Sequence, residues 1–228
     1  VIDIMKLTYL SLDVELDFSA NSITTLVIEN RKLFRSLACE FIKATKGEDT
    51  QWTLSESNKL LDIKKDCYII SDFFDLDVNN KTLLTKLNQR LTSIATEDVG
   101  LLFEINQKIQ ELFMALEGSL SLDVTYNNLI TAQDIVKLGN FMICDDEFDD
   151  IGKVISFIEV VVDLIRPKLL VMLNLRKFMT NSELELFFET ILCKKIPVFC
   201  IEGSDAEEIS VVQELEVLYT LDKDLCVF

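Results

Sequence analysis

The chain of 228 residues contains no histidine, and this absence narrows the chemistry open to it. Histidine is the usual general acid or base near neutral pH, and it completes Ser-His-Asp and Cys-His nucleophile systems and HExxH zinc sites. None of these can operate here. Carboxylate, lysine and metal-assisted chemistry stay open, but the composition favours a protein that is not an enzyme.

Glycine and proline are also scarce, at 6 and 2 residues. A phosphate-binding loop needs glycines that bring backbone amides onto the phosphate. The turn where such a loop would be expected follows the apolar segment ITTLVIE at 23–29 and reads Glu29-Asn30-Arg31-Lys32, with no GxxxxGK(S/T) pattern. GxGxxG is absent as well. If the body descends from a nucleotide-binding fold, its nucleotide site has been lost.

Long apolar runs and closely paired cysteines are missing too. No run reaches the roughly 18 apolar residues that span a membrane, and Asp3 and Lys6 interrupt the N-terminal apolar stretch, which argues against a signal peptide. The cysteines form no CxxC pair and each lies in or beside an apolar run, which predicts buried, reduced thiols and a cytoplasmic protein. They are Cys39, Cys67, Cys144, Cys193, Cys200 and Cys226.

What the chain does have is apolar material, at 49% of its residues, arranged as alternating strands and helices. Segment 5–18 predicts one or two strands. The strand 23–29 leads directly into a helix at 31–44, which is the opening of a βα unit. Further strands are expected at 67–71, 168–175 and 196–202, with 225–228 as a possible edge strand, and further helices after Thr131, at 147–165 and at 181–193. This alternation predicts an α/β fold with a largely parallel sheet.

Residues 79–117 have a different pattern. Apolar residues at 84, 87, 91 and 94, and again at 102, 105, 109, 112 and 116, are spaced three and four apart, with Thr96-Glu97-Asp98 between the two series. Two such series joined by a few residues predict an antiparallel helical hairpin that buries its apolar seam within itself. We therefore expect an α/β head formed by 1–78 and 139–228, and a helical leg at 79–138.

The net charge of −17 is unevenly distributed along the chain. Residues 96–165 hold 14 acids and 3 bases, and residues 200–228 hold 8 acids and 1 base, whereas the remainder is nearly neutral. The bases cluster at 31–35, 64–65, 81–90 and 166–177. Each cluster can be an ordinary solvated face, or the clusters can converge on one surface that faces a polyanion. The sequence leaves both readings open.

Two groups of acids are candidates for a metal site. The run at 145–150 can bind a hard cation or can begin a helix, where acids complement the helix dipole, and we favour the helix. Glu117 and Asp123 flank the turn after the second predicted leg helix and are the other candidate.

Several stretches, taken in order, resemble the short form of the Csn-two family of CRISPR subtype II-A spacer acquisition. They are MKLTYLSLD, ITTLVIENRKLFRSL, FFDLDVNNKTLLTKLNQRL, LEGSLSLD, DIVKLG, LLVMLNLRKFMTNSELE, IPVFCIEG and LDKDLCVF, which together cover nearly the whole chain from Met5. The resemblance implies a degenerate P-loop-like, nucleotide-binding-like α/β head with a helical leg. It also implies a homotetrameric ring that takes double-stranded DNA without reading its sequence.

The same resemblance implies calcium ions bound near the junction of head and leg, here with Glu117 and Asp123 as ligands, and association with other CRISPR adaptation proteins and the effector nuclease. The alternative is a protein-interaction scaffold of the acquisition complex that binds no DNA itself. An ATP-using α/β enzyme is disfavoured by the missing P-loop. Our candidate DNA-binding residues come from the basic clusters: Arg31, Lys32, Arg35, Lys81, Lys86, Arg90, Arg176 and Lys177.

Overall fold

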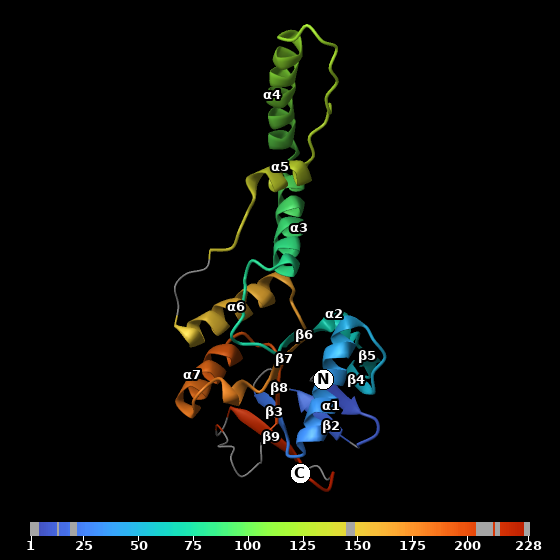
Figure 1. Cartoon of the computed structure of the whole chain (residues 1–228), viewed down its shortest axis with the longest axis vertical. Coiled ribbons are helices and arrows are strands. Elements are labelled where there is room, and N and C mark those ends of the chain that lie inside the picture. The colour runs from blue at the N-terminus through green and yellow to red at the C-terminus, as the bar shows by residue number, and fades with distance from the viewer. Residues whose placement is uncertain are drawn as a thin grey trace. The chain divides into compact units, whose positions relative to one another are not determined.

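The computed structural model describes residues 5–12, 14–18, 22–144, 149–203, 212 and 215–225 (Figure 1). The chain divides into two compact units. The first, which we call the head, comprises Val1–Leu76, Glu147–Val162 and Arg166–Phe228. The second, which we call the leg, comprises Asp77–Asp146 and Asp163–Ile165.

A five-stranded parallel sheet forms the centre of the head. Every neighbouring pair of its strands runs parallel, and all residues of β3, β7 and β8 are buried. Strands buried along their whole length are covered on both faces, as is usual in α/β proteins. The predicted α/β class with a parallel sheet is therefore confirmed. In spatial order the strands are β6 (Cys67–Ile70), β7 (Leu169–Leu173), β8 (Val198–Glu202), β3 (Ile23–Ile28) and β9 (Glu216–Leu221).

A smaller antiparallel sheet in the head packs against the same core. Its order is β2 (Val14–Phe18), β1 (Met5–Tyr9), β4 (Trp52–Glu56) and β5 (Lys59–Leu60). Trp52 lies edge-on to Tyr9, with ring centroids 4.8 Å apart, and to Phe199 of β8 at 6.4 Å. The contact between Trp52 and Phe199 joins the two sheets, since edge-to-face rings pack favourably at such distances.

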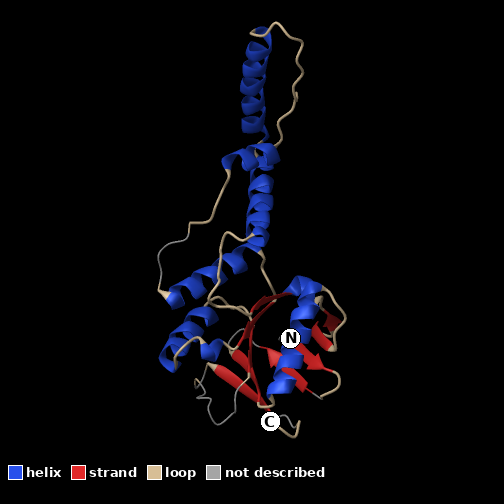
Figure 2. Ribbon diagram, viewed as in Figure 1, coloured by secondary structure: helices blue, strands red, loops and turns tan. Residues whose placement is uncertain are grey.

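Helices cover both faces of the parallel sheet. Helix α1 (Arg31–Lys46) packs through Phe41 against Trp52 and Phe199, and it ends at Gly47, whose φ of 86° is the left-handed conformation that glycine adopts without strain. Figure 2 shows two helices on the opposite side of the sheet, α6 (Asp150–Leu164) and α7 (Asn181–Leu192). The capping box of Thr180 and Glu183 begins α7 as predicted. The short α2 (Ile63–Asp66) and the 3-10 turn η1 (Leu175–Lys177) complete the head.

The leg contains α3 (Lys81–Glu97), α4 (Val99–Gly118) and α5 (Ala132–Gly139), the last with the predicted Thr131 cap. The predicted antiparallel packing of its first two helices is wrong. Only Asp98 separates α3 from α4, and one residue cannot reverse a chain between antiparallel helices, which takes two to five. Helix α4 instead continues onward from α3, and α5 packs against α3 (Figure 1).

The partner of α4 within the leg is the extended segment 119–131 rather than a helix. Asn106 donates from its amide to the Ile130 carbonyl at 2.8 Å and accepts from the Ile130 amide at 2.9 Å. Phe113 meets Tyr126 with ring centroids 5.2 Å apart. This segment covers one side of α4 and leaves the rest of the helix surface open, so that Leu101, Phe103, Leu112, Met114 and Leu116 are each more than half exposed.

Three further predictions need correction or fall outside the described residues. The edge strand next to β3 is β9, and the expected edge strand at 225–228 lies outside the described residues except for Leu225, which is in a bend. The acidic run at 145–150 lies mostly outside the described residues. Of the cysteines described, two are buried, but Cys39, Cys144 and Cys193 are exposed free thiols. Over the part of the chain that the structure describes, no helix has the length and hydropathy needed to cross a bilayer.

Candidate functional site

The turn between β3 and α1 stands where a nucleotide-binding fold would hold phosphate. In open parallel sheets, ligands bind outside the carboxyl ends of the strands, often on the free amides of a helix N-terminus. Here the Asn30 side chain accepts from the amides of Lys32 at 3.0 Å and Leu33 at 3.1 Å. The amides that would otherwise bind an anion are thus already satisfied within the helix cap.

Phe34 fills the space beside this turn. Its ring lies so close to Gly203, just after β8, that a Cβ atom at that glycine would come within 2.9 Å of the ring. The carboxyl edge of the sheet at this point is therefore occupied by an aromatic side chain from the first turn of α1. Together with the Asn30 cap, this packing leaves the nucleotide position inferred from the sequence without a phosphate cradle.

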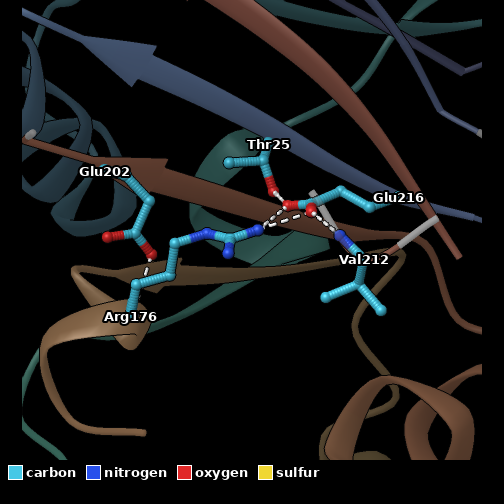
Figure 3. Close-up of polar contacts among 5 residues, drawn as sticks. All are labelled: Thr25, Arg176, Glu202, Val212 and Glu216. Carbon is cyan, nitrogen blue, oxygen red and sulfur yellow. Dashed lines mark hydrogen bonds and ion pairs between the residues drawn. The ribbon is translucent and has the colours of Figure 1, made fainter. Parts of the chain in front are cut away.

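A buried polar cluster connects strands of the parallel sheet to η1 (Figure 3). The Arg176 guanidinium forms an ion pair with Glu216, at the start of β9. Glu216 also accepts from the Thr25 hydroxyl of β3 and from the Val212 amide. Glu202, at the end of β8, accepts from the Arg176 backbone amide at 3.1 Å. The cluster joins β3, β8, β9 and η1 with two carboxylates and one guanidinium.

Glu202 carries the unbalanced charge of this cluster. It is fully buried, and its Oε2 atom has no hydrogen-bond partner among the described residues. Burial, with a smaller contribution from the Glu216 carboxylate, raises the pKa of the Glu202 carboxyl to about 7 against the opposing effect of the Arg176 amide and guanidinium. A carboxyl in this position holds a proton at mildly acidic pH, because ionisation would bury a second negative charge beside a single guanidinium.

This geometry corrects one predicted DNA contact. Arg176 is a predicted DNA-binding residue like its neighbour Lys177, but its side chain is only 10% exposed and is held by Glu216. Lys177 is exposed. The sequence does not show that Arg176 is buried and Lys177 is exposed. The partner carboxylate, Glu216, lies 40 positions further along the chain and meets Arg176 only through the sheet topology.

The predicted bases at the start of α1 are on the surface. Arg31, Lys32 and Arg35 are exposed, and none forms an ion pair with a described residue. Two further exposed bases near the end of the same helix, Lys43 and Lys46, were missed. Helical periodicity could have found Lys43, because positions 32, 36, 39 and 43 repeat at the four- and three-residue spacing of one helix face.

The remaining predicted bases lie on α3 of the leg. Lys81 and Lys86 are exposed and unpaired among the described residues. Arg90 is exposed but forms an ion pair with Asp163 of the same unit, which also raises the pKa of its guanidinium. The candidates thus fall on two separate units of the chain, with α1 holding the largest uncompensated group.

The predicted metal ligands Glu117 and Asp123 form no complete site with the other described residues. Glu117 and Asp123 are both exposed, and no group of three or more Cys, Asp or Glu able to hold a metal occurs among the residues that the structure describes. Calcium takes six to eight oxygen ligands. These two carboxylates alone do not supply that shell, so an ion here would need carbonyl oxygens, water or ligands from another chain.

Most of the chain matches a known protein family. The family model described as CRISPR-associated protein (Cas_Csn2) matches residues 45–225. The chain belongs to this CRISPR-associated Csn2 family. Membership confirms the resemblance inferred from the sequence and ties the protein to CRISPR adaptation. The match includes the leg and most of the head.

Two other comparisons add little to this assignment. No curated protein matches the chain. Among solved structures, it is similar to a nucleotide-free ATP-binding cassette from an ABC transporter, with 16% identity, a TM-score of 0.45 and coverage of 96% of this chain and 87% of that one. It is also similar to an ATP-binding cassette of an ABC transporter in its ADP conformation, with 14% identity, a TM-score of 0.47 and the same coverages.

The Glu202 carboxyl predicts a pH dependence of head stability. Unfolded, this group titrates near its ordinary pKa of 4.5, and folded near 7. Between these values the folded state keeps a proton that the unfolded state loses, so the free energy of unfolding should fall as pH rises from about 4.5 to 7, by about 3 kcal/mol. Glu202→Gln should remove this fall and be more stable than wild type at pH 8.

Urea denaturation at several pH values, followed through the fluorescence of Trp52, measures the effect. The matched control is Glu216→Gln, which removes the partner of Arg176 and should lower stability at every pH. A wild type and a Glu202→Gln variant whose stabilities run parallel from pH 5 to 8 would contradict the assignment.

Proposed function

We propose that this protein binds double-stranded DNA without reading its sequence, as a homotetrameric ring, during CRISPR spacer acquisition, and that it does so without catalysis. The observation that carries the proposal is the surface of α1, which holds five bases and the single acid Glu40 in a chain of net charge −17. Bases that no carboxylate compensates are suited to phosphate, and phosphate contacts alone carry no sequence information.

Self-association is supported by the open face of α4. A groove of about 580 Å³ lies along this face, with Leu101, Ile105, Ile109 and Leu112 at its centre and Glu104, Gln107 and Lys108 beside them. A contiguous apolar face of this kind on a water-exposed helix indicates an interface. We propose a second copy of the chain as its occupant within the ring.

The absence of catalysis is supported by the filled carboxyl edge of the sheet. The Asn30 cap and the Phe34 ring occupy the position where phosphate would bind. A second candidate function is a scaffold that organises other adaptation proteins and the effector nuclease without touching DNA. The open α4 face is compatible with it, and the DNA measurement below distinguishes the two.

Duplex binding should be independent of sequence and steeply dependent on salt. For backbone contacts, the logarithm of the binding constant falls by about 0.9 per neutralised phosphate for each tenfold rise in salt. A closed ring must thread a free end, so linear duplexes should bind and small closed circles should not. Mobility shifts at several salt concentrations measure both effects. Equal affinity for circles and linear DNA would rule out the ring, and no binding to either would favour the scaffold.

Substitution on the open face of α4 should reduce the oligomer. The Leu101→Glu, Leu112→Glu double variant places two charges in the apolar groove, and its mass in solution should fall from about four times the 26.1 kDa chain toward one or two copies. Leu138→Glu is the control, because Leu138 is 87% exposed on α5 and outside the groove. An unchanged mass of the double variant, or the same loss in the control, would remove α4 from the interface.

Calcium enters the proposal as a stabiliser of the assembly. Four chains of charge −17 repel one another, and a divalent ion near the acidic residues 96–165 would relieve that repulsion. Chelation should therefore lower the mass in solution and weaken DNA binding, calcium should restore both, and magnesium should do so less well because it requires a tighter shell. The Glu117→Gln, Asp123→Asn variant should no longer respond. An assembly that is unaffected by thorough chelation would refute this role.

A further inference from the structure

A groove of about 750 Å³ runs between the outer face of α1 and the chain at 49–51. Its wall on the helix side carries the face of α1 that repeats through positions 32, 36, 39 and 43. The lining residues are Lys32, Arg35, Ser36, Cys39, Glu40, Lys43, Asp49, Thr50 and Gln51. We infer that this groove is a phosphate-binding site that takes the sugar-phosphate backbone of a nucleic acid, an inference that rests on the proposed function.

Glu40 builds the groove and forms no ion pair with the described bases that line it. One carboxylate oxygen accepts from the Gln51 amide at 2.6 Å and from the Thr50 hydroxyl at 3.3 Å, and the other accepts from the Tyr9 hydroxyl at 2.7 Å. Both oxygens are therefore engaged in fixing the 49–51 segment and β1 to the helix. The second wall of the groove is held in place by the one acid that α1 contains.

Three cations in the groove have no carboxylate partner. Lys32, Arg35 and Lys43 are exposed, and no described residue forms an ion pair with any of them. From Lys32 to Lys43 the helix advances about 16 Å. One DNA strand carries a charge for about every 3.4 Å of axis, so a backbone lying along the groove would present several phosphates to these three side chains.

The lining favours phosphate over a base or an apolar ligand. It contains no aromatic side chain on which a base could stack, and stacking is the usual means of holding an unpaired base. Ser36 and Gln51 add neutral hydrogen-bond donors to the three cations. Asp49, on the opposite wall, is the one exposed acid in the lining, and it opposes an anion there.

The first test removes the three positive charges without introducing negative ones. The triple variant Lys32→Gln, Arg35→Gln, Lys43→Gln should bind a linear duplex at least tenfold more weakly at 0.1 M salt. Its salt dependence should also be shallower by about 2.7, three times the slope of one phosphate contact. Asp49→Asn should act in the opposite direction and tighten binding a few-fold.

The matched control has the same charge change elsewhere on the head. Lys59, Lys153 and Lys195 are exposed and outside the groove, and their replacement by Gln together should change affinity less than threefold and leave the slope within one unit of wild type. A groove variant with the wild-type slope would overturn the inference while leaving the proposed function intact. A wild-type chain that binds no duplex would overturn both.

A second test uses the native thiol inside the groove. Cys39 is an exposed free cysteine in the lining, and Cys193 is an exposed free cysteine at the end of α7. A bound 30-base-pair duplex should slow alkylation of Cys39 by iodoacetamide at least fivefold and leave Cys193 unchanged, as read by mass spectrometry. Equal protection by ATP alone would identify a free nucleotide as the source of the phosphate and reject the nucleic acid. Unchanged reactivity of Cys39 under saturating duplex would reject the groove.

Discussion

Strands β3, β7 and β8 are buried on both faces, and this constraint decides where the charges of the chain can lie. A buried strand excludes unpaired charge, because transferring an ion from water into the interior costs several kcal/mol. The exceptions in the sheet, Glu202 and Glu216, are tied to Arg176 and to backbone amides. The other described bases of the head lie outside this sheet, and α1 holds five of them. The basic surface is therefore a consequence of how the sheet is covered.

Strand β3, the turn after it and helix α1 have the strand–turn–helix topology of a phosphate-binding unit. Their side chains make other contacts. The amides at the start of the helix are capped by Asn30, and the ring of Phe34 rests on Gly203. The outward face of the same helix, three turns long from Lys32 to Lys43, carries the cations instead. In this member of the Csn2 family, the N-terminus of α1 is capped and does not offer its amides to a nucleotide. The helix instead presents a row of bases along its outward face.

The α/β class, the order of most strands and helices, and the helix caps at Thr131 and Thr180 could be predicted from the sequence, because each depends on local periodicity or on a cap within three residues. Pairing could not. The open face of α4 has the same three-and-four spacing whether a helix or the segment 119–131 lies beside it, and the one-residue joint at Asp98 gives no periodic signal. Arg176 was misjudged for the same reason, since its partner Glu216 is brought near only by the pairing of β9 with β3. Exposure of single bases on α1 followed from the pattern, but the groove depends on Glu40 reaching Tyr9 and Gln51.

Because only Asp98 separates α3 from α4, a small change in its torsions moves the far end of α4 by a large distance. A single non-helical residue offers only two soft torsions, φ and ψ, between two otherwise stiff rods. Helix α4 has 20 residues and is about 30 Å long, so a turn of about 20° at this residue would carry its far end through about 10 Å. The direction of α4 relative to α3 therefore depends on the torsions of Asp98, whose carboxylate accepts a hydrogen bond from the amide of Leu101. A contact that changed the torsions of Asp98 would also change the direction in which the apolar face of α4 points.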